Sequence, residues 1–339
     1  MTRARQTAVA VVRRLGEAGH IAYLAGGCVR DELLGRRPSD YDVATDATPD
    51  RVRALFPRTN EVGAAFGVVL VRESRVTIEV TTFRREGAYS DKRRPDDVQF
   101  ADAESDARRR DFTINALFLD PLAEPGPNER ARGVRGRVID YVGGVGDLDR
   151  RVVRAVGDPD DRLSEDHLRA LRAARFSARL GFALDDATAA AVRRHARSLT
   201  GVSRERIGEE FRRMLSHPTR AAAAHLVEAL GLDEPALGEP ALGARGAHDP
   251  VVLGGLPAEV GYATALAAWA LERAARRCGA LDLTNPAVAD ILHDTPARWR
   301  SALCLPNQTR DALAETLRLA QTLPREWPGL GTPGRKRAA

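Results

Sequence analysis

The chain has 339 residues, enough for two or three domains with cores of their own. Its 52 basic and 47 acidic residues leave a net charge of only +5, and lysine occurs at Lys92 and Lys336 alone. No apolar run reaches membrane length, and the three cysteines have neither paired nor metal-ligand spacing. We therefore exclude a membrane-spanning protein and a disulfide-stapled scaffold, and we expect reduced thiols in the cytoplasm.

A glycine turn is expected close to the N-terminus. Residues 1–20 predict an amphipathic helix rather than a signal peptide, and the apolar run 21–25 predicts a buried strand. Gly26-Gly27 then allows a sharp turn into a short helix from about Cys28 to Leu34. The helix N-terminus would attract an anion, and Arg30 adds donors for phosphate oxygens. Such a pair is more often only a turn, so this pattern alone is weak.

Two carboxylates follow the turn. Asp40 and Asp42 alternate around Tyr41, so an extended backbone points both to one side. Mg²⁺ takes oxygen ligands and is usually held by one or two carboxylates together with substrate phosphates. A solvated acidic turn at a strand edge explains the same pattern.

A third acid lies on the next predicted strand, residues 76–82. There Val76, Ile78 and Val80 alternate with polar residues, and Glu79 falls on the polar face. Three acids gathered on a small sheet suit two-metal phosphoryl transfer, in which one ion activates a hydroxyl and the other screens the leaving pyrophosphate.

Together these patterns resemble the class II tRNA nucleotidyltransferase and poly(A) polymerase group of the polymerase-beta superfamily. The resemblance covers about residues 20–215. Its blocks, in chain order, are Gly-Gly-x-Val-Arg-Asp at 26–31, Asp-x-Asp at 40–42, Glu-Val-Thr-Thr-Phe-Arg at 79–84, Arg-Arg-Asp-Phe-Thr-Ile-Asn-Ala-Leu at 109–117, Asp140 with Gly143-Gly144, the stretch 165–176, and Glu-Arg-Ile at 205–207. It implies an α+β fold, with a small mixed-sheet nucleotidyltransferase head followed by an all-helical neck and body.

The resemblance also implies roles for individual residues. Asp40 and Asp42 would hold Mg²⁺, with Glu79 as the third catalytic acid. The incoming nucleotide would be contacted by Gly27, Arg30, Arg110, Asp111 and Asn115. Without the resemblance, the basic run 108–110 is interpreted as a solvated face, and Asp111 as a helix N-cap.

The stretch 165–176 predicts one helix of about four turns. Ser164 is a suitable N-cap, apolar residues recur at helical spacing, and Gly181 ends the pattern. On physical grounds alone, Glu165 and Asp166 complement the helix dipole, and Glu165 with Arg169 is an ordinary i,i+4 pair.

The resemblance assigns this helix to base recognition. Asp166 and Arg169 would present an acceptor and donors to the edge of cytosine or adenine. Arg172 and Arg175 would lie farther along the same helix. Nine residues from Asp166 to Arg175 span roughly 13 Å of helix, about the length of a nucleotide.

Two segments bear on the choice within the family. The polar stretch 86–100 contains glycine and proline and resembles the flexible loop that full CCA-adding and A-adding enzymes possess and CC-adding relatives lack. Poly(A) polymerases carry a basic stretch near positions 62–71. Here residues 63–68 read Gly-Ala-Ala-Phe-Gly-Val, which is closer to the tRNA enzymes.

We predict a catalytic head at 1–148, a helical neck for base recognition at 149–216, and a tRNA-binding helical body at 217–339. Within the body, helices are expected at 221–230 and 262–277. The stretch 234–255 nearly repeats Glu-Pro-Ala-Leu-Gly and is expected to be a linker or long loop, and residues 324–339 are expected to be disordered.

The predicted function is Mg²⁺-dependent, template-independent addition of C, C and A from CTP and ATP to tRNA 3′ ends. A-adding or poly(A) synthesis is the nearest alternative, and a catalytically silent RNA-binding protein is the alternative from another class. Arginine patches could hold tRNA phosphates, although a GC-rich genome also explains abundant arginine. Family members usually carry a longer body and tail. The shorter region here is consistent with a minimal enzyme, with an enzyme that depends on a partner, and with an enzyme restricted to adding the terminal adenosine. A protein partner is unknown.

Overall fold

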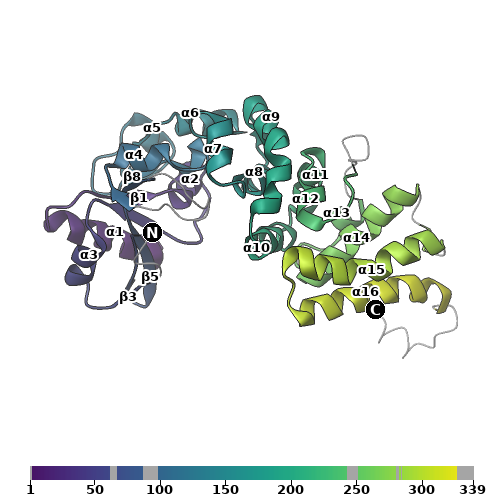
Figure 1. The fold of residues 1–339 in the computed structure, drawn as a ribbon. Coiled ribbons are helices and arrows are strands. Elements are labelled where there is room, and N and C mark those ends of the chain that lie inside the picture. Colours follow the sequence, from purple (N-terminus) through teal and green to yellow (C-terminus); the bar gives the residue numbers. More distant parts are fainter. Residues whose placement is uncertain are drawn as a thin grey trace. The chain divides into compact units, whose positions relative to one another are not determined.

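The computed structural model describes residues 2–61, 67–86, 98–242, 251–279, 282–283 and 285–326. The chain divides into two compact units, residues 1–166 and 167–339, a mixed-sheet unit and a helical one (Figure 1). This arrangement confirms the expected α+β fold. A separate neck at 149–216 and body at 217–339 remain predictions. No helix within the described ranges is long and apolar enough to cross a membrane.

The first unit contains a seven-stranded sheet in the order β3-β4-β5-β2-β1-β8-β9. Its strands are β1 (Ala22–Ala25), β2 (Asp42–Thr45), β3 (Thr59–Glu61), β4 (Val68–Glu73), β5 (Val76–Thr82), β8 (Phe118–Asp120) and β9 (Arg137–Ile139). β2 and β5 are parallel, and the other neighbours are antiparallel. Outside this sheet, β6 (Arg84–Glu86) pairs with β7 (Val98–Phe100), and β10 is Val152–Val153. The expected strands at 21–25 and 76–82 are confirmed.

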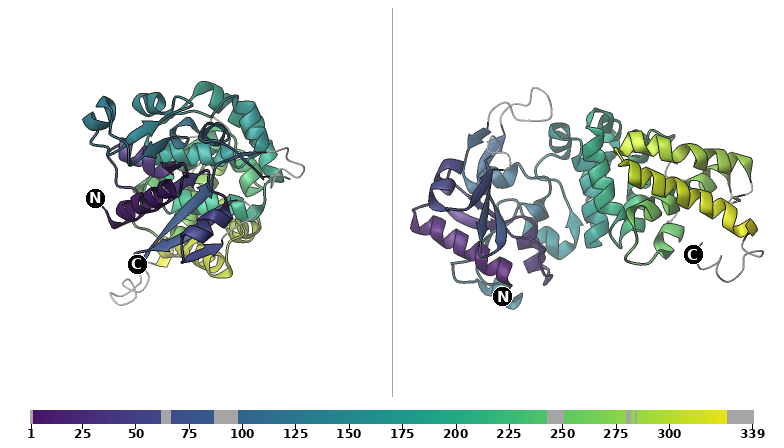
Figure 2. Two further views of the ribbon diagram at one scale, coloured as in Figure 1. Left: turned by 90° about the vertical axis from the view of Figure 1, so that its left-hand side faces the viewer. Right: turned by 90° about the horizontal axis from the view of Figure 1, so that it is seen from below.

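Several helices of this unit begin after a residue whose side chain caps them. They are α1 (Arg3–Glu17), α2 (Gly27–Leu33), α3 (Pro49–Leu55), α4 (Ala103–Arg108), α5 (Pro127–Ala131), α6 (Gly144–Arg150), α7 (Pro159–Glu165) and the 3₁₀ helix η2 (Thr113–Asn115). Thr48, Asp102 and Asp158 accept hydrogen bonds from the first turns of α3, α4 and α7. The first helix packs along β1, β2 and β5 (Figure 2).

The two faces of the sheet differ in chemistry. Leu24, Val43 and Val80 are fully buried on the face that α1 covers. On the other face, α4 contributes Ala103 and Ala107 to a core cluster with Ala25, Ala44, Phe83 and Phe118. Because side chains alternate along a strand, Asp42 lies on the same face as Ala44. The acids therefore lie beside an apolar cluster that fixes the ends of β1, β2 and β8.

The second unit is built mainly of helices. They are α8 (Arg169–Leu180), α9 (Asp186–His195), α10 (Arg204–Leu215), α11 (Arg220–Ala229), α12 (Asp233–Leu237), α13 (Val251–Gly255), α14 (Tyr262–Cys278), α15 (Pro286–Leu303), α16 (Asn307–Glu326) and the 3₁₀ helix η3 (Ala196–Gly201), with the short strand β11 (Ala183–Leu184). The expected helices at 221–230 and 262–277 are confirmed by α11 and α14.

The single helix expected across Glu165 to Phe176 is wrong. α7 ends at Glu165, Asp166 is extended with φ −150° and ψ 102°, and α8 begins only at Arg169. Ser164 therefore lies in the last turn of α7 and caps nothing. The earlier start signal at Asp158-Pro159 explains the error, because a capping aspartate followed by proline begins a helix six residues sooner.

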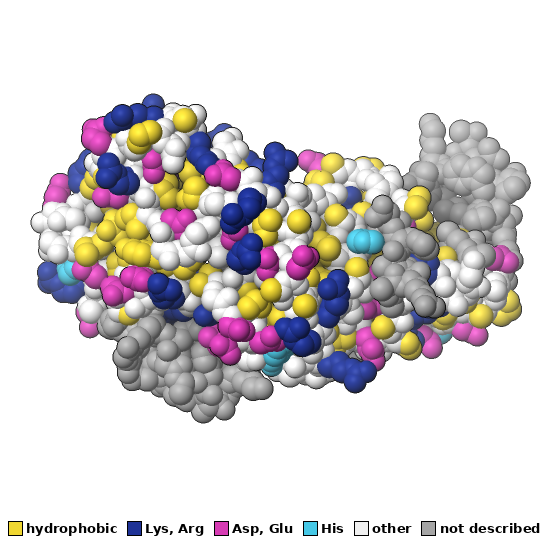
Figure 3. Space-filling model, turned by 90° about the horizontal axis from the view of Figure 1, so that it is seen from above, with side chains coloured by type: hydrophobic (Ala, Val, Ile, Leu, Met, Phe, Trp, Pro, Cys, Tyr) yellow, Lys and Arg dark blue, Asp and Glu magenta, His cyan; other side chains and the backbone are white. Residues whose placement is uncertain are grey.

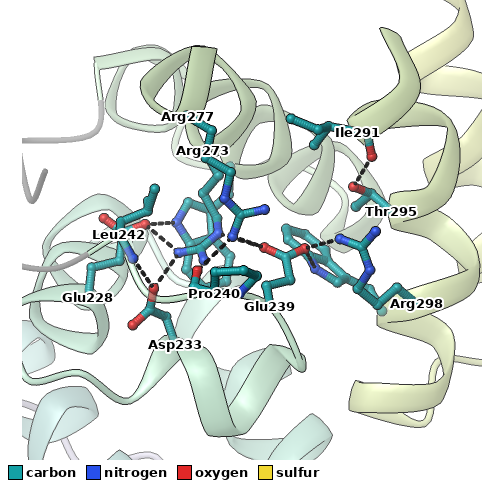
Figure 4. A network of polar contacts seen from close by, with 12 residues as sticks. Glu228, Asp233, Glu239, Pro240, Leu242, Arg273, Arg277, Ile291, Thr295 and Arg298 are labelled. Carbon is teal, nitrogen blue, oxygen red and sulfur yellow. Dashed lines mark hydrogen bonds and ion pairs between the residues drawn. The ribbon is translucent and has the colours of Figure 1, made fainter. Parts of the chain in front are cut away.

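The linker expected at 234–255 is also partly wrong. Its first residues form α12, and Val251–Gly255 forms α13, while 243–250 lie outside the described residues. Glu239, in the second copy of the repeat, is 3% exposed and accepts hydrogen bonds from Arg273, Arg277, Arg298 and Trp299 (Figure 4). These contacts anchor the second copy of the repeat in the core of the second unit.

Arg273 of α14 lies at the centre of this network. Its guanidinium donates to Glu228 and Asp233 at 3.0 Å each and to Glu239 at 3.2 Å. The side chain is 2% exposed, and those of Glu228 and Asp233 are 0% exposed. Trp269 Nε1 also donates to Glu228, so the network links α11, α12 and α14.

The three cysteines are free thiols, of which Cys28 is buried, Cys278 intermediate and Cys304 exposed. Cys28 lies in the first turn of α2, and its Sγ donates to Ala25 O at 3.4 Å. Burial raises the pKa of the Cys28 thiol to about 12. Cys28 is therefore a packing residue and not a nucleophile.

Candidate active site

The glycine turn after β1 has a conformation that requires glycine. Gly26 has φ +72°, and its amide donates to Leu117 O at 2.9 Å. A Cβ on Gly26 would come within 2.8 Å of Arg110 Nη1, and one on Gly27 would lie 3.7 Å from Arg30 Nη2. Two guanidinium groups therefore border the turn, which is the arrangement expected of a phosphate site.

Arg30 is held in place by neighbouring polar side chains. Its Nη1 donates to Asn115 Oδ1 at 2.6 Å, and its Nε donates to Asp31 at 2.8 Å. Asn115 Nδ2 donates in turn to Asp111 Oδ1 at 3.2 Å, and this oxygen also accepts the Phe112 amide. Arg30, Asn115 and Asp111 are each 8% exposed. Asp111 is therefore part of this chain of contacts and not the N-cap of η2, which is Phe112.

Arg110 is anchored by a residue that sequence reasoning missed. Asp106 of α4 is 1% exposed and accepts from Arg109 Nε at 2.8 Å and from Arg110 Nη2 at 3.0 Å. Arg110 Nη1 donates to Asn115 O at 3.0 Å, and its guanidinium lies 5.0 Å from the Phe118 ring centroid. The spacing of Asp106 three and four residues before the arginines could have revealed it.

Two of the three predicted acids, Asp42 and Glu79, lie in one row across the sheet. β2 and β5 place Asp42 opposite Glu79, and β1 places Ala25 opposite Asp42. Paired residues share a face, so both carboxylates project beside the Gly26 turn. Asp40 precedes β2 and is exposed. The sequence-predicted residues Gly27, Arg30, Arg110, Asn115, Asp42 and Glu79 are thus brought together in the first unit.

The acids repel one another. Burial, then Glu79 and Asp40, raise the pKa of Asp42 to about 7, with Arg110 acting in the opposite direction. Burial and Asp40 also raise the pKa of Glu79. Neighbouring carboxylates that resist ionisation are relieved by a cation, so the donor set fits a divalent metal ion. Among the described residues, no group of three or more His, Cys, Asp or Glu side chains forms a metal site by itself.

The raised pKa of Asp42 has a consequence for stability. Folding stability contributed by this carboxyl falls as pH rises from its unfolded pKa of 3.8 to about 7, because the folded state holds the proton more tightly. We expect Asp42→Asn, in chelating buffer, to raise the free energy of unfolding by about 2–4 kcal/mol at pH 8 and by little at pH 4. Urea titrations at both pH values, followed by far-UV circular dichroism, measure the difference. An equal effect at both would contradict the raised pKa.

The residues predicted to recognise the base, Asp166 and Arg169, fall on either side of the boundary between the units. Asp166 ends the first unit, and Arg169 is the first residue of α8 in the second. Asp166 is therefore not on the same helix as the arginines, which corrects the 13 Å estimate. The base-reading roles of Asp166 and Arg169 remain predictions.

Arg172 and Arg175 lie on α8 as expected. Arg175 Nε donates to Glu210 Oε2 of α10 at 2.6 Å, and the two side chains are 7% and 3% exposed. Both Arg172 and Arg175 lie over the ring of Phe176. Burial lowers the pKa of Arg175. Arg175 therefore supports the packing of α8 on α10, and nucleotide contact by either arginine remains a prediction.

A second missed residue supports the turn that carries Asn115. Asp147 of α6 is 2% exposed and accepts from Thr113 Oγ1 at 2.7 Å, and it also pairs with Arg150 and Arg154. Asp147 thereby ties η2 to α6. Nothing in the local spacing indicates this contact with Thr113, which is 34 residues away.

Two family models match the chain. The poly A polymerase head domain matches residues 22–154, and the probable RNA and SrmB-binding site of polymerase A matches residues 181–242. The first match contains the glycine turn, the three acids and the 109–117 block. Asp166 and Arg169 fall between the two matches.

Named relatives agree with these models. The chain is 45% identical over 223 residues to the CCA-adding enzyme of Bacillus subtilis, a match that covers 65% of this chain and 53% of the relative. It is 44% identical to that of Anoxybacillus flavithermus over the same length. The matched region thus spans about half of these curated relatives. A crystal structure of the Bacillus stearothermophilus CCA-adding enzyme in complex with CTP aligns with a TM-score of 0.75 and 31% identity, covering 100% of this chain and 75% of the other.

Proposed function

Since the chain belongs to the class II CCA-adding and poly(A) polymerase family, we propose that it adds C, C and A from CTP and ATP to the 3′ end of tRNA. The substrates and the tRNA partner are part of this proposal, because the match spans only about half of the curated relatives. A cytoplasmic location, where immature tRNA is available, is inferred with them.

One observation carries the proposal: Asp42 and Glu79 lie side by side on the sheet face that borders the Arg30 and Arg110 turn. Acids alone would suit many metal sites, and arginines alone would suit any anion. Their juxtaposition suits a nucleoside triphosphate, whose phosphates need both cationic donors and a metal ion. The 31% identity to a CTP-bound relative supports the same choice.

These residues support a mechanism of direct displacement at the α-phosphorus. Arg30 and Arg110 would hold the phosphates of the nucleotide beside the Gly26 turn. The tRNA 3′-hydroxyl would release its proton to water, and its oxygen would bond to the α-phosphorus. The bond from that phosphorus to the bridging oxygen would break, and pyrophosphate would leave. The family generally uses a divalent metal. Mg²⁺ held by Asp40 and Asp42 would lower the pKa of the attacking hydroxyl and screen negative charge.

We propose that Asp166 and Arg169 discriminate between the bases of CTP and ATP. We expect Asp166→Ala or Arg169→Ala to change the ratio of CTP to ATP incorporation about 5- to 150-fold, because a lost bidentate base contact removes about 1–3 kcal/mol of discrimination. Competition assays with both nucleotides measure this ratio. Exposed Asp186→Ala is the matched control for folding. Unchanged selectivity with lower stability would show a purely structural role.

Product length tests the whole proposal. Purified protein and Mg²⁺ would be incubated with one tRNA ending at the discriminator base and another ending in CC, with CTP, ATP or both. Growth by three nucleotides on the first tRNA is expected. Growth by one on the CC-ending tRNA alone would indicate an A-adding enzyme, and long A tracts a poly(A) polymerase.

An absence of growth would reject catalysis by the isolated chain. A Mg²⁺-dependent nucleotide-binding assay would then separate an enzyme that lacks a partner from a silent RNA-binding protein. Basic and acidic side chains alternate over the described surface that Figure 3 draws, so a single basic patch does not mark the RNA path on that face.

A further inference from the structure

A buried polar cluster lies behind the acidic pair. Arg5 Nε of α1 donates to Glu32 Oε1 of α2 at 2.7 Å, and Arg5 Nη2 donates to Arg135 O at 2.6 Å. Tyr41 Oη donates to the same Glu32 oxygen at 2.8 Å. Arg5 is 8% exposed and Tyr41 is 4% exposed. One carboxylate oxygen thus joins α1, α2 and the segment that enters β2.

Tyr41 connects this cluster to the site, because it stands between Asp40 and Asp42. Exposure alternates along the segment, with Asp40 exposed, Tyr41 buried and Asp42 intermediate. The tyrosine ring therefore points away from the carboxylates. Its hydroxyl is the contact that fixes this short segment to the helix behind it.

The same helix also carries the phosphate-site arginine. Arg30 points toward Asn115, whereas Glu32 points toward Arg5 and Tyr41. α2 is thus held on both sides, and it links the glycine turn to the acidic pair. Arg5 lies before residue 22, where the family match begins.

We propose that Glu32, anchored by Arg5, is a positioning residue that fixes the Asp40–Asp42 pair through Tyr41 and so sets the affinity of this pair for a divalent cation. The inference rests on the proposed metal role of that pair. Its physical basis is repulsion: three neighbouring carboxylates push the exposed Asp40 end outward, and the buried Tyr41 hydroxyl opposes this movement. Groups that orient metal ligands in this way commonly change metal affinity about 10–100-fold when they are lost.

The test is Mn²⁺ binding, measured by electron paramagnetic resonance on the full chain without nucleotide or RNA. Tyr41→Phe keeps the ring and removes only the hydroxyl. We expect it to raise the Mn²⁺ dissociation constant about tenfold. Glu32→Gln, which can still accept from Tyr41 but loses the ion pair with Arg5, should also weaken binding.

Thr82→Val is the matched control. Thr82 is 1% exposed, and its Oγ1 donates to Ala47 O at 2.7 Å, so the variant also loses one buried hydroxyl contact in the same sheet. It should lose stability without losing Mn²⁺ affinity. A thermal melt of each variant defines a temperature at which all are folded.

Unchanged Mn²⁺ affinity in Tyr41→Phe at that temperature would overturn the proposal, as would an equal loss in Thr82→Val. Absence of Mn²⁺ binding by the unaltered chain would overturn it as well. If Mn²⁺ binds and responds to Tyr41→Phe but no tRNA is extended, the positioning role stands and the proposed function fails.

Discussion

Replacing Asp42 with alanine is expected to reduce nucleotide incorporation by about three orders of magnitude. Burial and the neighbouring acids raise the pKa of Asp42 to about 7, and Asp42 is paired with Glu79 on the sheet. Loss of a metal ligand removes several kcal/mol of charge stabilisation in the transition state, and each 1.36 kcal/mol is a factor of about ten in rate. Single-turnover incorporation on a CC-ending tRNA measures the loss.

The fold should survive this change, because an uncharged residue relieves the repulsion at the site. Asp50→Ala is the control, since Asp50 lies on α3 and its side chain is 81% exposed. Its activity should match that of the unaltered chain. If Asp42→Ala retains more than about a tenth of the rate, that is, if it costs less than about 1.4 kcal/mol, the metal assignment is wrong.

Replacing Arg273 with methionine should destabilise the second unit by about 4 kcal/mol. The change leaves Glu228, Asp233 and Glu239 buried without their shared cation, and breaking a buried ion pair from one side typically costs about 3–5 kcal/mol. All three tryptophans lie after residue 166 in the chain. Urea unfolding followed by tryptophan fluorescence therefore reports this unit alone.

Arg318→Met provides the comparison, because Arg318 lies on α16 with its side chain 59% exposed. It should change stability by less than about 0.5 kcal/mol. A similarly small effect at Arg273 would show that the stability of this unit does not depend on the ion pairs of Arg273.

Local sequence patterns predicted the strands and the turn of the first unit well, because these features depend on residues that are close together in the sequence. The alternation of residues 76–82 gave β5 with its exact bounds and placed Glu79 on the polar face. The glycine pair gave the turn, and the Asp-x-Asp pattern gave Asp42, which the structure pairs with Ala25 at the end of β1 next to that turn. Each depends on contacts within a few residues.

The wrong predictions concern segments whose structure depends on contacts with residues that are far away in the sequence. The repeat at 234–243 is composed like a linker, yet Glu239 is fixed by arginines and a tryptophan from α14 and α15. The break at Asp166 was hidden because the acidic residues that end α7 also suit the start of a helix. The supporting role of Asp147 could not be predicted, because its partner Thr113 is far away in the sequence.

The burial of Cys28 allows local opening of the first unit to be measured separately from the second unit. Cys28 is 2% exposed and lies directly after the glycine turn, whereas Cys304 is exposed. A pulse of alkylating reagent should modify Cys304 in the native protein and reach Cys28 only when α2 leaves the sheet. Mass spectrometry of the Cys28 peptide then measures the rate at which the glycine turn and α2 open, and a ligand that binds at this turn should lower that rate.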